Sequence, residues 1–388
     1  MATTANRLTD FGPLTGGHAI SAELDALLTR AAGDPVLVAG GADAAGPVEI
    51  RRDLRVALDG SGGFSITRFS WCAKWRDGAG RFRARLFLHE PARRPAATFD
   101  FPADPWLPAA AAALDADGVA VLRYIPTRRI TFGRGDAVVG KVKRPRTVER
   151  SYAILRAAHA AAGRASFGVP EPLGIDAPRG VFYQQRMPGR SVAELIDADN
   201  APALMRRVGA LHAAVHALAV DGVPERPLAD QLAGVHADAA WVAFAMPGEA
   251  GAVAAVERHV VSELEALGPG SPAFCHGDPA IDQVLLDGDA AAVVDFDDAG
   301  IGDPYADLGA MAASLALDTR GLPHGTGAPE AYLEGYREGA GRALDERRLR
   351  AHWLRADLAV FASRLHKGRL GAGAAAAALA DLAAAARR

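Results

Sequence analysis

Hydrophobic and polar residues alternate along an early part of the chain, from about residue 48 to residue 101. The segments IRRDLRVAL, FSITRFSWCAKW and RFRARLFLHE run apolar or alternate, and DGSGG and RDGAG separate them. Alternation with a period of two, interrupted by Gly and Asp, is typical of β-strands joined by tight turns. We therefore expect a β-meander here, preceded by a short amphipathic helix in ISAELDALLTRAA.

A second β-rich stretch follows a proline-punctuated link with one helix, FPADPWLPAAAAALDADG. Three strands with turns at IPTR and GRGD are predicted in VAVLRYIPTRRITFGRGDAVVGKVKRP. A helix is predicted in TVERSYAILRAAHAAAG, with Thr147 as N-cap and Gly163 as its stop. Two more strands are predicted in GVPEPLGIDAPRGVFYQQRMPG. The pattern therefore indicates a lobe of five strands and one helix.

From Ser191 onward the pattern is mainly helical. The exception is VLLDGDAAAVVDF, which predicts a β-hairpin with Asp287 and Gly288 in its turn. The predicted fold class is α+β, with two lobes and an extra β-rich N-terminal cap. We expect the cap at residues 1–105, the first lobe at 106–189 and the helical lobe at 190–388.

Composition narrows the class of protein. A net charge of −3 and a pI near 6.4 give no reason to expect nucleic acid as the main partner. The N-terminus has no charged segment followed by an apolar one, and the Ala-rich tract from Gly371 to Ala386 favours a surface helix over a membrane span. We expect a cytoplasmic protein in which Cys72 and Cys275 stay reduced.

The candidate chemistry lies in the segment Phe274–Gly309, which reads FCHGDPAIDQVLLDGDAAAVVDFDDAGIGDPYADLG. It contains a His-Gly-Asp turn, an amide five residues after that Asp, and a second Asp after an apolar run. Phosphoryl transfer needs this layout, with Asp278 beside an attacking hydroxyl and Gln283 and Asp295 holding Mg²⁺ on nucleotide phosphates. Asp297 is a further oxygen donor at the same strand end.

Neighbouring residues of this segment are interpreted as architecture. We expect His276 to bond the backbone and hold the loop, and Gly277 to adopt unusual backbone angles. The remaining aspartates fit turns and caps, with Asp307 opening or bracing the helix DLGAMAASL.

A strand lysine is the candidate phosphate ligand, because the chain has only four lysines. Lys141 lies between apolar residues in AVVGKVKRP. Lys143 faces the same side by strand alternation and competes for the role, but it adjoins the strand end. Glu149 is the only acid in the following helix, so we predict that it pairs with Lys141. The alternatives are two solvated lysines and a glutamate that stabilises the helix N-terminus.

A third candidate is the stretch YQQRMPG, from Tyr183 to Gly189, where a predicted strand ends. Backbone groups from Gln185 to Met187 can pair with an adenine edge, and Met187 can pack on the ring. An ordinary strand end is the alternative.

These motifs resemble the aminoglycoside phosphotransferase-like branch of the protein-kinase-like fold. HGD-x4-Q, DFDDAGIGDPYADLG and the strand lysine are similar to that family's catalytic loop, metal-binding segment and nucleotide lysine. The resemblance covers roughly Val119 to Leu317. It implies that Asp278 is the catalytic base, that Gln283 and Asp295 are metal ligands and that Lys141 contacts phosphate. The implied cofactors are ATP (or GTP) and Mg²⁺.

The chain departs from this family at several positions. The family usually has Asn where Gln283 stands. The bacterial maltokinase and glucosamine-kinase branch is similar to this chain in having Gln at that position and an N-terminal cap. That branch, however, usually has His in place of Ala280. No glycine-rich phosphate loop is obvious, and PTRR, with Arg128 and Arg129, stands in its place as a possible arginine-assisted loop. Gly277 leaves no partner for a phosphorylated activation segment, which favours a small-molecule kinase over a protein kinase.

The sequence thus predicts an ATP- and Mg²⁺-dependent O-phosphotransferase acting on a hydroxyl of a small polyhydroxylated metabolite, such as a sugar, an aminoglycoside or another natural product. The alternatives are a sugar kinase of the maltokinase or glucosamine-kinase type and a catalytically weak nucleotide-binding pseudokinase module. From Thr319 to the end, seven acids face twelve Lys and Arg, which favours a neutral or anionic acceptor. The expected partner is that acceptor, without nucleic acid or membrane, and the oligomeric state is open.

Overall fold

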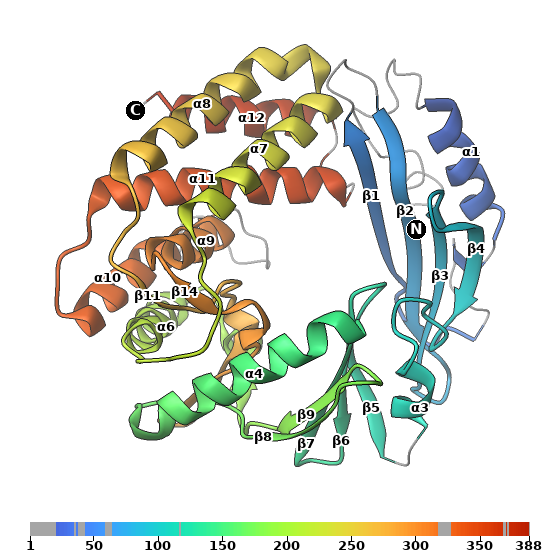
Figure 1. Ribbon diagram of the computed structural model, residues 1–388, viewed down its shortest axis with the longest axis horizontal. Coiled ribbons are helices and arrows are strands. Elements are labelled where there is room, and N and C mark those ends of the chain that lie inside the picture. The colour runs from blue at the N-terminus through green and yellow to red at the C-terminus, as the bar shows by residue number, and fades with distance from the viewer. Residues whose placement is uncertain are drawn as a thin grey trace.

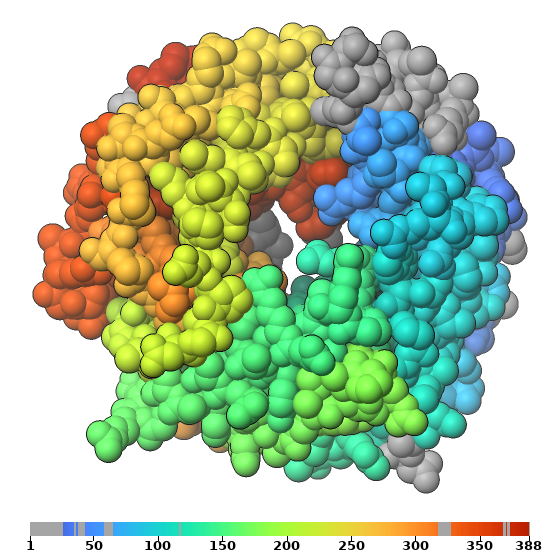
Figure 2. Space-filling view, viewed as in Figure 1, coloured from blue at the N-terminus to red at the C-terminus, as the bar shows by residue number. Residues whose placement is uncertain are grey.

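The computed structural model describes residues 21–34, 36–37, 43–58, 64–115, 118–316, 327–367, 370 and 372–387. Its elements form a ring (Figure 1): an N-terminal sheet lies on one side, a second sheet and a long helix lie below, and the remaining helices close the other side. The space-filling view shows that the molecule is hollowed at the centre of this ring (Figure 2).

The N-terminal sheet is the predicted meander, with one strand more than expected. Its antiparallel order is β1-β2-β3-β4, and α1 (Ser21–Ala32) packs on it through Leu27, Leu28 and Ala31. The strands are β1 (Glu49–Leu58), β2 (Phe64–Arg76), β3 (Phe82–Glu90) and β4 (Arg94–Asp100). The sequence pattern missed β4 because it contains Pro95, and a proline is tolerated in an edge strand such as this one. The expected DGSGG turn lies outside the described residues.

The first lobe has the predicted five strands and one long helix. Its sheet has the order β5-β6-β7-β9-β8. The strands are β5 (Val119–Ile125), β6 (Arg129–Arg134), β7 (Val138–Lys143), β8 (Pro172–Asp176) and β9 (Val181–Gln185). The short helix α3 (Ala110–Leu114) precedes the sheet in the predicted link.

The long helix of this lobe, α4 (Pro145–Ala161), begins earlier than predicted. Pro145 occupies its first turn, where the fixed φ of proline suits a helix and its missing N–H costs nothing. Thr147 is therefore not the N-cap; its hydroxyl donates to the Arg144 carbonyl. After α4 the chain continues through a 3₁₀ turn, η3 (Ala162–Arg164), which includes the predicted stop at Gly163.

In the described part of the chain, the helical lobe contains eight helices and three short 3₁₀ turns, two of which lie in the catalytic segment. The helices are α5 (Val192–Leu195), α6 (Ala201–His216), α7 (Leu228–Ala245), α8 (Ala250–Leu267), α9 (Tyr305–Ala316), α10 (Ala328–Ala340), α11 (Glu346–His366) and α12 (Ala372–Ala385). The 3₁₀ turns are η4 (Pro247–Glu249), η5 (Ile281–Gln283) and η6 (Phe296–Asp298). Helix α12 lies in the predicted C-terminal tract, and Ala375 and Leu379 are buried on its inner face.

The predicted hairpin is present in one of two small sheets of this lobe. One sheet joins β10 (Arg190–Ser191), β12 (Val284–Asp287) and β13 (Ala290–Val293), and the other joins β11 (Ala273–Cys275) to β14 (Gly300–Gly302). Asp287 pairs with Ala290, so the two turn residues are Gly288 and Asp289 rather than the predicted Asp287 and Gly288. Gly288 takes the positive φ of 56° that such a turn requires.

The N-terminal sheet packs on both lobes. Leu54 and Phe69 share one core with the helical lobe residues Trp241 and Leu358, while Leu86 shares another with the five-stranded sheet. The sheet therefore closes the ring. The division into a cap at 1–105 and lobes at 106–189 and 190–388 stays a prediction.

Two simpler expectations concern membranes and cysteines. Within the described part of the chain, no single helix is long and apolar enough to cross a membrane. Helices α7 and α8 together have the required length and hydropathy, but a bend of 119° separates them. Cys72 and Cys275 are both free and buried, as predicted for reduced thiols. The N-terminal residues, in which no leader was predicted, lie outside the residues that the structure describes.

Helices α6 and α10 pack closely enough to require glycine, which gives a test of the fold. A Cβ at Gly209 would overlap the Tyr332 carbonyl, so we expect Gly209→Ala to lower the free energy of unfolding by at least about 1–3 kcal/mol. Gly234 in α7 has no atom within 4 Å of such a Cβ, and Gly234→Ala should raise stability by up to about 1 kcal/mol. Urea unfolding of both variants measures the difference. Equal effects would contradict the close packing of α6 on α10.

Candidate active site

The predicted catalytic loop follows β11 and has the expected architecture. The Nε2 atom of His276 lies 3.0 Å from the Val294 carbonyl, which confirms that His276 bonds the backbone. Gly277 has φ 86°, as predicted, and a Cβ there would overlap the Asp298 carbonyl. The loop therefore turns sharply at a position that only glycine fits, and it presents Asp278 to the cleft.

Asp307 holds this loop through hydrogen bonds to its backbone. Its buried carboxylate accepts the backbone N–H groups of His276 at 2.6 Å and of Gly277 at 3.1 Å, and it lies 3.3 Å from Nε2 of His216. Burial would raise the pKa of Asp307, but the hydrogen bond and charge of His216, with His276, lower it to about 2. The sequence indicated only a turn or helix brace here, because no local spacing links residue 307 to residue 276.

The two metal-binding candidates meet the strand lysines at the lobe junction. Asp295 takes φ 71°, a left-handed conformation that is costly for a residue with a Cβ, and η6 then presents Asp297 on the same side. Lys141 Nζ lies 2.7 Å from Asp295 Oδ1 and 3.0 Å from Asp297 Oδ1. Lys143 Nζ lies 2.9 Å from Asp297 Oδ2. Both lysines thus reach this acidic pair, and Lys141 is the more deeply buried.

Arg129 completes this charge cluster. Its two terminal nitrogens contact both oxygens of Asp295, at 3.2 and 2.9 Å, and Oδ2 of Asp297, at 3.1 Å. The predicted Arg128 is exposed and lines the cleft, so Arg129 is the arginine nearer the acidic pair. Arg128 lies in the turn before β6, whereas Arg129 is the first residue of the strand.

Burial and pairing act in opposite directions on these charges. Burial would raise the pKa of Asp295, but Lys141 and Arg129 hold it well below its usual range. Burial would lower the pKa of Lys141, but Asp295 and Asp297 raise it. Lys141 and Asp295 therefore stay charged near neutral pH.

Glu149 does not pair with Lys141. Glu149 is exposed on α4, whereas the lysine is directed to Asp295 and Asp297. The inward position of the helix is taken by the buried Ser151, whose hydroxyl oxygen lies 2.6 Å from Lys143 Nζ. The prediction failed because Glu149 and Ser151, two residues apart, lie on different sides of a helix.

Two of the backbone groups that were predicted to pair with an adenine edge are hydrogen-bonded within the protein. The backbone N–H of Gln185 donates to the Glu171 carbonyl and that of Arg186 to the Ala137 carbonyl, so both are already used. The side chain of Met187 is half-buried and packs toward Gly168, where a Cβ would lie 2.7 Å from Met187 Cε. A nucleotide ring could contact this edge through Met187 and not through those two N–H groups.

Gln283 fits the role of an oxygen ligand for a cation. Its side chain is buried at the start of the hairpin, and Oε1 has no hydrogen-bond partner within the described residues. Buried polar atoms are nearly always satisfied, so this oxygen is available to coordinate a ligand. Amide and carboxylate oxygens, as on Gln283, Asp295 and Asp297, are the donors that Mg²⁺ prefers.

Asp278 stands apart from the ion pairs. Its side chain is exposed to a cleft of about 750 Å³ that also contains Gln283, Asp297 and Asp298. The protein around it restricts hydration, and this burial, together with the negative charge of Asp298, raises the pKa of Asp278. The cleft opens toward the hollow seen in Figure 2.

The model of a family described as "Phosphotransferase enzyme family" matches residues 124–352, which is more than half of the chain. The protein belongs to this family. This phosphotransferase is a small-molecule kinase, as the motifs of its catalytic segment indicated. A comparison with curated proteins gives no match.

The fold of this phosphotransferase is similar to that of a solved aminoglycoside phosphotransferase. A thermostable mutant of aminoglycoside phosphotransferase APH(4)-Ia is 19% identical with a TM-score of 0.52, covering 69% of this chain and 94% of that one. A choline/ethanolamine kinase family protein from Mesorhizobium loti is 19% identical (TM-score 0.48, 71% and 90% covered). Macrolide 2′-phosphotransferase MphH from Brachybacterium faecium is 22% identical (TM-score 0.44, 73% and 97% covered). The predicted α+β, protein-kinase-like fold is confirmed, and the similarity to the maltokinase and glucosamine-kinase branch stays a prediction.

The network under the catalytic loop can be tested by stability. Asp307→Asn keeps the shape but removes the charge that accepts two backbone N–H groups, so we expect a loss of about 2–3 kcal/mol in the free energy of unfolding at pH 7. Because the pKa of Asp307 is lowered, its stabilisation is present above the unfolded pKa of about 4 and is lost as the pH falls toward 2.

Urea unfolding between pH 7 and pH 3 measures this effect, and the gap between wild type and variant should narrow at the acid end. The control is Asp289→Asn, at an exposed turn position, which should change stability by less than about 0.5 kcal/mol. A gap that does not depend on pH would contradict the assignment to the charge of Asp307.

Proposed function

We propose that this phosphotransferase transfers the γ-phosphoryl group of ATP to a hydroxyl of a small polyhydroxylated metabolite. The observation that carries the proposal is the meeting of Lys141 and Arg129 with Asp295 and Asp297, beside a cleft that exposes Asp278. Phosphoryl transfer is catalysed mainly by positioning and by stabilising charge, and this cluster offers both signs of charge at one place.

Each of these residues has a distinct role in the transfer. Asp278 accepts a hydrogen bond from the acceptor hydroxyl and orients it for in-line attack on the γ-phosphorus; the proton leaves toward this carboxylate. Lys141 and Arg129 turn from the aspartates toward the nucleotide phosphates. The β5–β6 turn stays fixed, since the Thr127 N–H donates to Asp104 Oδ2 at 2.7 Å, and it brings Arg128 to the cleft in place of a glycine-rich loop.

Gln283 and Asp295, with Asp297, would hold Mg²⁺ in this proposal. When bound, the cation would supply positive charge beside the nucleotide phosphates, and Lys141 and Arg129 would contact phosphate oxygens instead of the aspartates. The partnerless Oε1 of Gln283, and the presence of Gln283 and Asp297 in the lining of one cleft, support this role. GTP is the alternative phosphoryl donor.

Activity with a panel of acceptors tests the proposal. ADP release from Mg-ATP is measured with aminoglycosides, hexosamines, maltose and nucleosides, in wild type and in Asp278→Ala. We expect one class of acceptor to stimulate wild type and Asp278→Ala to lose about 10²–10⁴-fold in turnover. If no acceptor raises wild-type turnover above that of the variant, the proposed reaction is wrong.

The acid limb of the pH profile gives an independent check. Because the pKa of Asp278 is raised, kcat/KM should fall as the pH drops through a value above the usual aspartate range. Asp298→Asn removes one cause of the raised pKa and should move this limb to lower pH.

Substitution distinguishes the roles of the two lysines. Lys141 is more buried and contacts both aspartates, so Lys141→Met should lower kcat/KM for Mg-ATP by about 10²–10³-fold. Lys143→Met should have a smaller effect, because Lys143 contacts only Asp297 and Ser151. Steady-state kinetics with Mg-ATP as the varied substrate decides, and a larger loss in Lys143→Met would reverse the assignment.

A further inference from the structure

The N-terminal sheet forms one wall of the active-site cleft, and arginines line that wall. Arg51 and Arg55 on β1 and Arg68 on β2 share the cleft with Asp278 and Asp298. All three arginines precede residue 124, where the family match begins. Membership of the family therefore assigns no role to them.

The cleft as a whole carries an excess of positive charge. Ten of its lining residues are Lys or Arg and four are Asp, so its field favours an anion. Two of those aspartates are paired within the cleft, Asp297 with Arg129 and Lys143, and Asp282 with Arg123. What is left of the negative charge lies at Asp278 and Asp298, where the acceptor hydroxyl is proposed to bind.

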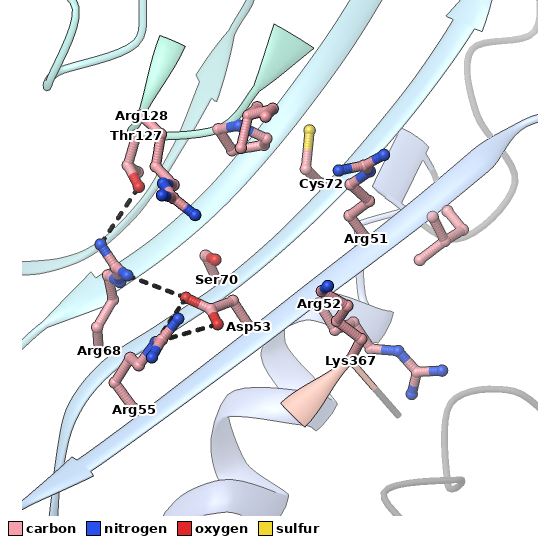
Figure 3. Close-up of a pocket in the computed structure, with 13 residues that line it drawn as sticks. Arg51, Arg52, Asp53, Arg55, Arg68, Ser70, Cys72, Thr127, Arg128 and Lys367 are labelled. Atoms are coloured by element: carbon pink, nitrogen blue, oxygen red, sulfur yellow. Dashed lines mark hydrogen bonds and ion pairs between the residues drawn. The ribbon is translucent and has the colours of Figure 1, made fainter. Parts of the chain in front are cut away.

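The arginines of the wall are only partly neutralised. Figure 3 shows Arg55 and Arg68 converging on the single carboxylate of Asp53, at 3.2 and 3.0 Å. One negative charge thus faces two guanidinium groups. The Nε atom of Arg68 is buried and has no hydrogen-bond partner within the described residues. The wall therefore retains both net charge and an unused donor.

A third arginine joins them at the turn between β5 and β6. Arg68 donates to Thr127 Oγ1 at 3.3 Å and Arg144 Nε donates to the Thr127 carbonyl at 2.7 Å, so both are held on one residue. The Arg144 guanidinium also stacks on Trp106, 4.4 Å from the ring centroid. Within the described chain Arg144 forms no ion pair with a carboxylate. Burial and the charges of Arg68 and Arg146 lower the pKa of Arg144, as crowded cations do.

We propose that Arg55, Arg68 and Arg144 form an acceptor subsite that binds a phosphate or carboxylate group, so that the acceptor is an anionic polyhydroxylated metabolite. The planar guanidinium group suits both anions, because it can donate two parallel hydrogen bonds. A polycationic acceptor would be repelled by the same wall. This inference rests on the proposed function, with Asp278 orienting the hydroxyl at the other end of the acceptor.

The arginines could bind the nucleotide phosphates instead of an anionic group of the acceptor, and a binding experiment distinguishes these two ligands. Inorganic phosphate is titrated calorimetrically into the full-length protein saturated with Mg²⁺ and a non-hydrolysable ATP analogue, which occupies the nucleotide site. Wild type should bind phosphate, and Arg55→Gln/Arg68→Gln should bind it at least about tenfold more weakly. The single variant Arg55→Gln repeats the test at a half-exposed side chain, where loss of folding is not expected.

Arg179→Gln is the matched control, since Arg179 is an exposed arginine with one nearby aspartate partner, Asp176, and it does not line the cleft. It should bind phosphate like wild type. Phosphate binding that is absent in wild type, or equally tight in the double variant, would overturn the subsite whatever the activity. A rise in KM for Mg-ATP without weaker phosphate binding would assign the arginines to the nucleotide and would also overturn it.

Activity then tests the acceptor class. Glucose 6-phosphate and gluconate are compared with glucose and with kanamycin, and an anionic acceptor should have the highest kcat/KM and lose at least about tenfold in the double variant. Highest activity on kanamycin, unchanged in the double variant, would overturn the inference and leave the proposed reaction standing. Wild-type turnover can also stay at the level of Asp278→Ala for every acceptor while phosphate binding still depends on the arginines. That result would contradict the proposed reaction and support the anion subsite alone.

Discussion

Five charged side chains meet where the first lobe faces the catalytic segment, and the geometry of the site depends on their pairing. Lys141, Lys143 and Arg129 come from neighbouring strands, and Asp295 and Asp297 follow the hairpin. All are largely buried, and a buried charge without a partner costs several kcal/mol. The two lobes must therefore meet in one register, and the left-handed backbone at Asp295 is retained because the pairing requires it.

The N-terminal sheet gives this arrangement a third wall. It shares one core with α7, α8 and α11 and another with the five-stranded sheet, so the cleft is bounded from three directions. At the far end of α11 the His366 ring stacks on Trp241, 3.9 Å between centroids, and its Nδ1 lies 2.9 Å from the Leu54 carbonyl. Burial and nearby Arg55 lower the pKa of His366 to about 4, so this contact is uncharged at neutral pH. This contact therefore holds the wall by ring stacking and a hydrogen bond.

Local patterns predicted the elements well and their ends less well. Alternation identified the strands of both sheets, since each strand has one buried face, but β4 was missed because Pro95 interrupts its pattern. The start of α4 was placed at Thr147, although Pro145 already suits a first turn. The turn of the hairpin moved by one residue because strand pairing, rather than the Asp-Gly pair itself, sets which residues lie in the loop.

The sequence by itself determined the kind of chemistry: the spacing of Asp278, Gln283 and Asp295, with a strand lysine, indicated phosphoryl transfer, and the loop roles of His276 and Gly277 followed from their neighbours. Only the tertiary structure decided the partners. Lys141 turned to Asp295 instead of Glu149, Asp307 supported a loop some thirty residues away, and cap arginines reached the cleft. A motif records bonds along the chain, whereas ion pairs form between groups that folding brings within a few ångströms, whatever their separation in sequence.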